Sequence, residues 1–439
     1  MYLCGMGRSF EELKVAKSLL RALGEIGFTE PTPVQELAIP VINSGINVVG
    51  IAQTGTGKTA AYLLPLLTRL VKAEGTEPRC IVLVPTRELS VQVGEDVAEL
   101  TPYTDLRSAA VFGGVGWTKH AELLSPGIDL LVATPGRLWD LYQAGALSFR
   151  KVKFLVIDEA DRMLDMGFMP QLRQLFEIIP PRRQNLLFSA TFPEKMEQMA
   201  EEFLDHYERV EVAPSATPVE QVEQMVYRVP NFQAKLVLIR HLLTDEAAFH
   251  RVILFVKTKT SADAVFKVVK RKAEGEKRIM HSDKGQSTRL NAIRAFKEGE
   301  VRILITTDLS ARGLDASLVS HVINFDIPPH YEDYIHRIGR TARAGNRGTA
   351  ITLVTPDEEW HLKRIEKMIR MEIPIAEIPA GITFPETAFE ERQRQKREVD
   401  RQRKIDDPSF KGAFHQKKKR PEGHAGGRKP RQGKPGRRK

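Results

Sequence analysis

NVVGIAQTGTGKT, residues 47–59, joins a short apolar run to a glycine-rich turn that ends in Lys-Thr. The apolar run predicts a buried strand, and the apolar residues that follow Thr59 predict a helix. Gly55 and Gly57 let backbone N–H groups turn inward on a phosphate, where Lys58 reaches the β- and γ-phosphates. The stretch therefore predicts an α/β domain that binds a nucleoside triphosphate, with the Thr59 hydroxyl offered to Mg²⁺.

The general phosphate-loop pattern has glycine where this chain has Ala52, so the match is to an A-x-x-G-x-G-K-T variant. The strand before the loop and the helix after it are the context that this loop requires. The residues predicted to surround the triphosphate are Ala52, Gln53, Thr54, Gly55, Thr56, Gly57, Lys58 and Thr59.

Short β-branched runs recur along the chain at intervals long enough for helices. Their nearly continuous hydrophobicity is typical of parallel strands that are covered on both faces. The first set is CIVLVP (80–85), DLLVATP (129–135), FLVIDEAD (154–161) and NLLFSAT (185–191). The second set is RVILFV (251–256), VRILITTD (301–308), SHVINFD (320–326) and GTAITLV (348–354). Two α/β domains are therefore predicted, over residues 1–212 and 222–378, with APSATPVEQ (213–221) as the linker.

The run VIDEAD at residues 156–161 ends an apolar strand with three carboxylates. The carboxyl end of a parallel strand reaches the crevice in which a phosphate loop also lies. We expect Asp158 to bind Mg²⁺ largely through water, and Glu159 to orient and deprotonate the attacking water.

Length and composition set limits on the rest of the chain. The 439 residues suggest two or three domains, and 42% apolar residues exclude wholesale disorder. No run reaches the roughly 18 apolar residues of a spanning helix, and two cysteines cannot build a disulfide framework. These features predict a soluble, cytoplasmic protein that does not contact membranes.

The net charge of +10 is carried by the C-terminal end. Residues 411–439 contain twelve Lys or Arg and one acid, Glu422, so the remainder of the chain is nearly neutral. In the extension, residues 379–439, the segment 390–407 is almost wholly charged, and from Pro408 onward Gly, Pro, Lys and Arg dominate, so that this last part cannot build a packed core. Residues 390–407 are predicted to form either a solvated helix or a disordered segment. The last 29 residues are predicted to be a disordered basic tail.

Three segments together resemble the DEAD-box RNA helicases, of the bacterial type close to the RhlE group. They are Asp-Glu-Ala-Asp at 158–161, AQTGTGKT at 52–59 and HRIGRTARAG at 336–345. The resemblance covers roughly residues 10–378. It implies an α/β fold of two tandem RecA-like domains, parallel sheets covered by helices, followed by the basic tail. It also implies an RNA-dependent ATPase that uses Mg²⁺ and locally separates RNA duplexes or remodels RNA–protein complexes.

The resemblance assigns roles to individual residues around ATP. Phe28 and Gln35 lie in the adenine-recognition motif, where an amide can pair with adenine N6 and N7 and so select ATP over GTP. Asp315 takes the ribose hydroxyls, and Arg340 and Arg343 act as fingers on the γ-phosphate. The residues implied to couple hydrolysis to strand separation are Asp161, Ser189 and Thr191.

RNA contacts are likewise implied by motifs at or beyond strand ends. In the first domain these are Pro85, Arg87, Gly114, Thr134 and Arg137. In the second domain these are Gln286, Arg289 and Thr307. Such groups meet the backbone of RNA rather than its bases, so no sequence preference is implied.

Two alternative functions remain open on sequence alone. An RNA clamp or annealing protein would not need Lys58, Glu159 or the arginine fingers, and all are present. A DNA helicase of the same superfamily is disfavoured only by the family resemblance. The tail is expected either to tether RNA or to serve solubility or targeting, and ribosomal or RNA-degradation components are the expected protein partners.

Overall fold

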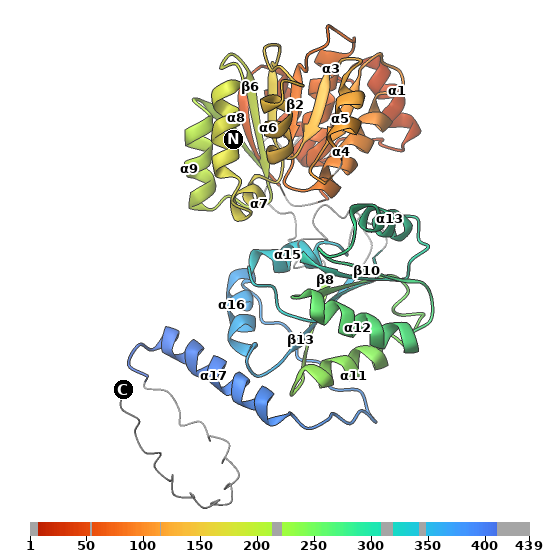
Figure 1. The fold of residues 1–439 in the computed structure, drawn as a ribbon, viewed down its shortest axis with the longest axis vertical. Helices are drawn as coiled ribbons and strands as arrows, with labels where there is room; N and C mark the ends of the chain where they lie inside the picture. Colours follow the sequence, from red (N-terminus) through yellow and green to blue (C-terminus); the bar gives the residue numbers. More distant parts are fainter. Residues whose placement is uncertain are drawn as a thin grey trace, which may run out of the picture. The chain divides into compact units, whose positions relative to one another are not determined.

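The structure, a computed structural model, describes residues 8–52, 55–114, 116–212, 222–308, 319–341 and 348–410. The chain divides into two compact units between Phe384 and Pro385. The first unit contains two parallel β-sheets, and the described part of the second unit contains helix α17 (Figure 1). No helix in the described ranges combines the length and the apolar character needed to cross a bilayer.

The first sheet has seven strands in the order β3-β4-β2-β5-β6-β1-β7, and every pairing is parallel. The strands are β1 (Asn47–Ile51), β2 (Cys80–Leu83), β3 (Ser108–Val111), β4 (Leu130–Ala133), β5 (Phe154–Ile157), β6 (Gln184–Ser189) and β7 (Tyr207–Glu211). Because all strands run the same way, their carboxyl ends form one edge.

Helices cover both faces of this sheet (Figure 1). The side chains of neighbouring positions alternate between two cores: Val48 and Val156 face one, Val49 and Leu155 face the other. The first core is closed by α1 (Lys17–Glu25), α2 (Pro33–Asn43), α3 (Lys58–Leu70) and α4 (Arg87–Leu100). The second core is closed mainly by α6 (Pro135–Gln143), α7 (Ala160–Asp165), α8 (Met169–Ile178) and α9 (Glu194–Phe203). Helix α5 (Trp117–Leu124) follows β3.

The second sheet has six parallel strands in the order β10-β11-β9-β12-β13-β8. The strands are β8 (Val222–Arg228), β9 (Val252–Val256), β10 (Lys277–Met280), β11 (Ile303–Thr307), β12 (His321–Asn324) and β13 (Gly348–Val354). Its helices are α11 (Phe232–Leu242), α12 (Lys259–Lys272), α13 (Gln286–Lys297), α15 (Glu332–Ile338) and α16 (Glu359–Ile369). Ile382 and Phe384 pack against the core that α11 and α12 cover.

The two predicted sets of parallel strands are confirmed, since each predicted run contains a strand of one of the two sheets. The predicted linker, residues 213–221, lies outside the described residues. The charged segment after the second sheet contains a helix, α17 (Phe389–Asp406), which was one of the two alternatives. Glu390 and Glu391 occupy its first turn and Arg403 and Lys404 its last, the arrangement that the helix dipole favours.

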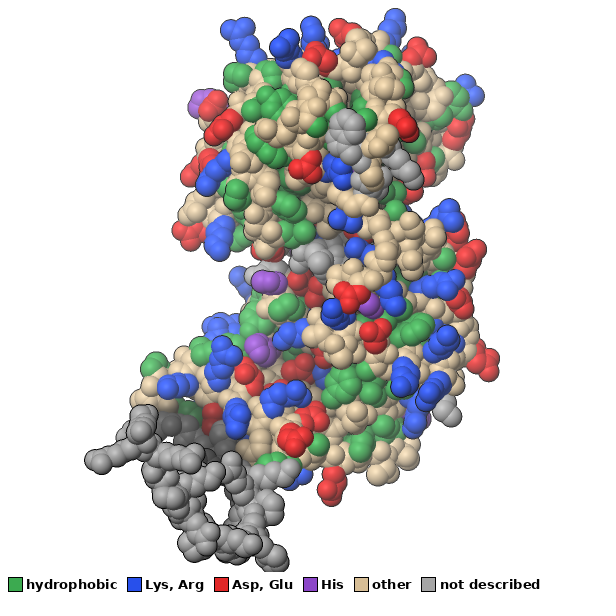
Figure 2. Space-filling view, in the orientation of Figure 1, with side chains coloured by type: hydrophobic (Ala, Val, Ile, Leu, Met, Phe, Trp, Pro, Cys, Tyr) green, Lys and Arg blue, Asp and Glu red, His purple; other side chains and the backbone are tan. Residues whose placement is uncertain are grey.

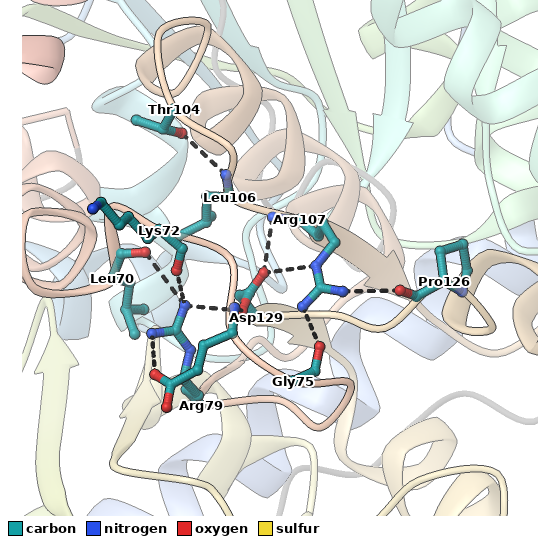
Figure 3. Close-up of polar contacts among 10 residues, drawn as sticks. Leu70, Lys72, Gly75, Arg79, Thr104, Leu106, Arg107, Pro126 and Asp129 are labelled. Carbon is teal, nitrogen blue, oxygen red and sulfur yellow. Dashed lines mark hydrogen bonds and ion pairs between the residues drawn. The ribbon is translucent and has the colours of Figure 1, made fainter.

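A buried carboxylate connects the segments that precede β2, β3 and β4 of the first sheet (Figure 3). Asp129, which has no exposed surface, precedes β4 and accepts hydrogen bonds from Arg79 Nη2 at 2.8 Å and Arg107 Nε at 2.9 Å. The backbone N–H groups of Glu74 and Arg107 also donate to it, at 2.9 and 3.1 Å. Burial raises the pKa of Asp129, but these donors outweigh it and hold the pKa below the ordinary 3.8.

Replacing Asp129 by Asn should lower the free energy of unfolding by about 3–5 kcal/mol, because the guanidinium groups of the buried Arg79 and the partly buried Arg107 lose the buried negative charge that they share. The pKa of the carboxyl is lower in the folded state, so its stabilisation is complete near neutral pH and disappears as the pH falls through the folded-state pKa. Urea unfolding at pH 7 and at pH 3 measures both effects. The control is Glu202→Gln, which breaks an exposed ion pair with Arg173 and should cost less than about 1 kcal/mol. Equal losses in the two variants would contradict the prediction.

Candidate nucleotide and RNA site

The phosphate loop connects β1 to α3, as the sequence predicts. Gly55 and Gly57 have φ values of 82° and 89°, in the left-handed region that side chains rarely adopt. Gly57 is the N-cap of α3, so Lys58 and Thr59 form the first turn of that helix. The backbone N–H groups at a helix start are a general anion site, which suits a triphosphate. Gln53 and Thr54 lie outside the described residues.

A cavity of about 320 Å³ opens at this loop. Its walls include Gly55, Gly57, Lys58 and Thr59 from the loop and Asp158 and Glu159 from the end of β5. The Lys58 ammonium donates to the carbonyl oxygen of Ala52, across the loop. Burial lowers the pKa of Lys58, against the raising effect of the nearby Asp158.

Asp158 and Glu159 differ in environment although they are adjacent. Asp158 is buried, and its two oxygens accept from Tyr62 Oη at 2.8 Å and from the Glu159 N–H at 2.9 Å. Burial raises its pKa to about 6, with the Glu159 charge adding to the shift. Glu159 has φ 50° and ψ 50°, a strained conformation for a side-chain-bearing residue. The Glu159 side chain lines the same cavity as Asp158 and Lys58.

The third carboxylate of the run holds the loop after β6. Asp161 Oδ2 accepts from the N–H groups of Ala190 and Thr191 at 3.2 and 3.1 Å and from Thr191 Oγ1 at 3.0 Å. Ser189 Oγ donates to the Thr191 carbonyl at 2.7 Å. Burial raises the pKa of Asp161, but His336 beside it, together with Arg162, lowers the pKa below its ordinary value. Asp161, Ser189 and Thr191 therefore form one hydrogen-bonded group.

The predicted adenine residues occupy different environments. Phe28 lines the cavity with 41% of its surface exposed. Gln35 has no exposed surface: its Oε1 accepts from Thr32 N at 3.0 Å and its Nε2 donates to the Gly57 carbonyl at 3.1 Å. The amide therefore contacts the phosphate loop itself, and it keeps a second N–H on Nε2 and a second lone pair on Oε1.

Arg340 lines the same cavity as Lys58 and Asp158. Its side chain is 5% exposed and its Nε donates to the His336 carbonyl at 3.1 Å. An arginine that follows helix α15 of the second sheet thus reaches the loop of the first. Arg343 and Asp315 lie outside the described residues.

The predicted RNA residues follow the carboxyl ends of strands in each sheet. Those of the first sheet are Pro85 and Arg87 after β2, Gly114 after β3, and Thr134 and Arg137 after β4. Those of the second sheet are Gln286 and Arg289 after β10, and Thr307 at the end of β11. Gly114 has φ 85°, and a Cβ there would lie 2.3 Å from Arg87 Nη1, so the glycine lets the guanidinium approach the turn. The structure thus places each set at one edge of its sheet.

One of the predicted RNA residues, Arg289, pairs with Glu88, an acid that the sequence analysis did not single out. Arg289 Nη2 pairs with Glu88 Oε1 at 2.6 Å, and Arg87 Nη1 donates to Gln286 Oε1 at 3.4 Å. Glu88 is 5% exposed, so Arg289 meets a desolvated carboxylate rather than water. Tyr62, the partner of Asp158, was also missed, although its position four residues after Lys58 places it on the same helix face.

Mg²⁺ fits the oxygen groups of the cavity. It keeps several waters and binds through one or two carboxylates together with substrate phosphates, rather than in an all-protein cage. Thr59 and Asp158 supply such groups, whereas the buried Glu159 Oε2 forms an ion pair with Arg162 Nε at 3.5 Å. No cluster of three or more His, Cys, Asp or Glu suited to a metal occurs in the part of the chain that is described. The residues therefore suit a hydrated metal ion that arrives with the nucleotide.

Comparison with known proteins identifies the family. The DEAD/DEAH box helicase family matches residues 32–199, and the helicase conserved C-terminal domain matches residues 233–345. The DEAD-box ATP-dependent RNA helicase RhpA of Helicobacter pylori is 39% identical over 371 residues, which cover 84% of this chain and 74% of that one. The chain belongs to the DEAD-box ATP-dependent RNA helicases.

Two further comparisons support this family assignment. The ATP-dependent RNA helicase SrmB of Escherichia coli is 40% identical over 365 residues, 82% of each chain. The structure of S. cerevisiae Dbp5 bound to RNA and ADP BeF3 has a TM-score of 0.76 at 31% identity, and covers 84% of this chain and 95% of that one. The predicted fold of two RecA-like domains and the predicted function are confirmed: this is an ATP-hydrolysing enzyme that acts on RNA.

Proposed function

We propose that this helicase hydrolyses ATP in the cavity at the phosphate loop, with RNA bound along the carboxyl edges of both sheets. The observation that carries the proposal is that Lys58, Asp158 and Glu159 line one cavity with Arg340, which comes from the other half of the chain. A nucleotide site completed by an arginine from a second domain accounts for that arrangement.

In the proposed reaction, Glu159 orients a water molecule and takes its proton as the water oxygen attacks the γ-phosphorus. The bond to the β-phosphate oxygen breaks, and ADP and phosphate result. The positive side chains of Lys58, Arg340 and Arg343 stabilise the negative charge that develops on the phosphoryl oxygens. Magnesium, held by Thr59 and Asp158 largely through water, supplies neutralisation of the β- and γ-phosphate oxygens when it is bound.

Nucleotide choice is proposed to depend on Gln35 and Phe28, with Asp315 on the ribose hydroxyls. The Phe28 ring is exposed to the cavity and offers a face on which a base can stack. Gln35 already bonds to the carbonyl oxygen of Gly57. The second N–H and the second lone pair of the amide would remain for adenine, so Gln35 would connect the base site to the loop.

A single RNA strand is proposed to bind to residues of both sheets. Arg87, Gly114, Thr134 and their neighbours present backbone N–H groups, hydroxyls and guanidinium groups to phosphates of a single strand. ATP and RNA are each bound by groups from both domains, so together they favour a closed state, and phosphate release reopens it. The network of Asp161, Ser189 and Thr191 couples the two events, since it connects the DEAD segment to the loop after β6.

Finer assignments also belong to the proposal. We place the domains at residues 1–212 and 222–378, joined by 213–221 and followed by the extension 379–439. We further propose that the protein acts in the cytoplasm, belongs near the RhlE group, and meets ribosomal or RNA-degradation components.

The proposed function is tested by measuring ATP turnover under three conditions. These are no nucleic acid, RNA, and DNA of the same sequence. RNA should raise turnover and DNA should not, because the backbone contacts extend to 2′-hydroxyls. Turnover unaffected by RNA would favour a clamp that binds without hydrolysis, and equal stimulation by DNA would favour a DNA helicase.

The basic tail is proposed to tether RNA to a nearly neutral body. Acidic and basic side chains are interspersed on the visible face of the described residues (Figure 2), whereas residues 411–439 carry twelve Lys or Arg against one acid. Each phosphate contact releases counterions and contributes about −0.7 to the slope of log affinity against log salt on single strands.

Removing residues 411–439 should leave ATP turnover at saturating RNA unchanged. The truncation should raise the RNA concentration needed for half-maximal stimulation and flatten its salt dependence by about 0.7 for each phosphate that the tail no longer neutralises. The cut follows Phe410 because Ile382 and Phe384 pack against the core that α11 and α12 cover. A full-length control with residues 411–439 in scrambled order should behave as the native chain. Equal salt slopes with and without the tail would favour a solubilising or targeting role.

A further inference from the structure

One buried polar group at the nucleotide site has no part in the proposed mechanism. Tyr62 lies on α3, three residues after Thr59 and four after Lys58, so all three share a helix face. Its side chain has no exposed surface, and its hydroxyl donates to Asp158 Oδ2 at 2.8 Å. A hydroxyl buried this deeply is costly unless it is bonded, and here its acceptor is the metal-binding carboxylate.

The Tyr62 ring is fixed by packing. It lies against Phe188 of β6 with ring centroids 5.3 Å apart and planes tilted by 50°. Phe188 in turn lies against Gly50 of β1, where an added Cβ would approach the Phe188 ring to 2.4 Å. Strands β1 and β6 therefore set the place of the ring, and the hydroxyl cannot swing away from Asp158 without displacing the core.

Asp158 is held at both oxygens. Oδ1 accepts from the Glu159 N–H at 2.9 Å and Oδ2 from Tyr62. The first donor belongs to the next residue along the chain, whereas the second belongs to the helix that begins at the phosphate loop. The Tyr62 hydroxyl thus fixes the carboxylate plane relative to Lys58 and Thr59, the two side chains that meet the triphosphate and its metal.

We propose that Tyr62 is a positioning residue: its hydroxyl aims the Asp158 carboxylate at the hydrated magnesium that accompanies ATP. The inference rests on the proposed role of Asp158 in binding that metal through water. Groups that hydrogen-bond a metal-binding carboxylate orient it, and their loss generally costs about 10–100-fold in metal affinity or activity. A phenylalanine would fill the same space, so the core does not require the hydroxyl.

The test is Tyr62→Phe in the full-length chain, which removes one oxygen and keeps the ring. Three measurements are made: thermal unfolding without nucleotide, binding of a fluorescent ADP analogue in EDTA, and the same binding during a MgCl₂ titration. The variant should remain folded and bind the analogue in EDTA within two-fold of the native protein. Its half-saturating Mg²⁺ concentration should rise about ten-fold. Steady-state turnover should show the same shift in Mg²⁺ dependence, with the KM for ATP at saturating Mg²⁺ nearly unchanged.

Tyr103→Phe is the matched control, because Tyr103 donates to Glu25 Oε1 at 2.5 Å, a phenol–carboxylate bond at the surface. It should leave the Mg²⁺ titration unaltered. A Tyr62→Phe variant whose Mg²⁺ half-saturation stays within two-fold of native overturns the proposal, even where its stability or kcat falls. If the native protein itself binds the analogue independently of Mg²⁺, the assigned role of Asp158 fails as well, and the two failures are thereby told apart.

Discussion

Replacing Glu159 by glutamine is expected to lower ATP turnover by about 10²–10⁴-fold while ATP and RNA still bind, which is the usual contribution of a positioned general base. Glu159 lines the cavity beside Lys58 and Asp158. Glutamine has nearly the same shape but cannot take a proton from water. Because ATP and RNA favour the closed state together, the variant should hold RNA longer in the presence of ATP than the native protein does.

Single-turnover hydrolysis and the lifetime of the RNA complex with ATP measure the two parts of this prediction. Glu95→Gln is the control, since Glu95 is exposed on α4 and does not line the cavity. It should hydrolyse ATP at the native rate. Hydrolysis by Glu159→Gln within ten-fold of the native rate would assign the base to another group. Loss of ATP binding would instead show that the substitution disturbs the strained backbone at this position.

The strands that the sequence predicted are those at the centres of the sheets. All four strands that it missed, β3, β7, β8 and β10, are edge strands. Central strands are buried on both faces and read as continuous apolar runs, such as CIVL in β2. Edge strands expose part of their surface, so β7 reads YERVE and β10 reads KRIM, which have no such run. These segments form strands because they hydrogen-bond to the adjacent strand of the sheet.

Site residues were predictable where one short segment contains several of them. Lys58 and Thr59 follow a strand and a glycine turn, and the carboxylates of residues 158–161 follow another strand, so local sequence placed them at one sheet edge. Arg340 was predicted through the family resemblance alone, because no local pattern states which cavity a distant arginine reaches.

Partners that depend on the folded arrangement could not be predicted in this way. Glu88 pairs with Arg289, about two hundred positions away along the chain, and nothing near either residue signals the other. Gln35 was predicted to read adenine, and the structure shows its amide bonded to Thr32 and Gly57. Its contact with the base remains a prediction, since an amide without a ligand satisfies itself with nearby groups.

Substituting Arg340 by alanine is expected to lower RNA-stimulated ATP turnover by about 10³-fold or more, within the range that arginine fingers contribute. The side chain lines the cavity of the phosphate loop, and the bond from its Nε to the His336 carbonyl holds it there. Charge builds on the phosphoryl oxygens in the transition state, so the arginine should stabilise that state more than bound ATP. The KM for ATP should therefore change far less than kcat.

Arg340→Lys separates charge from geometry. Lysine keeps the positive charge but loses the planar fork, so this variant should recover only part of the rate. Arg278→Ala is the control, because Arg278 lies on the exposed edge strand β10 and pairs only with the neighbouring Glu276 among the ion pairs described. It should retain native turnover. If Arg340→Ala still responds to RNA with a rate within ten-fold of native, the arginine does not act on the phosphate, and hydrolysis does not depend on the second domain through this residue.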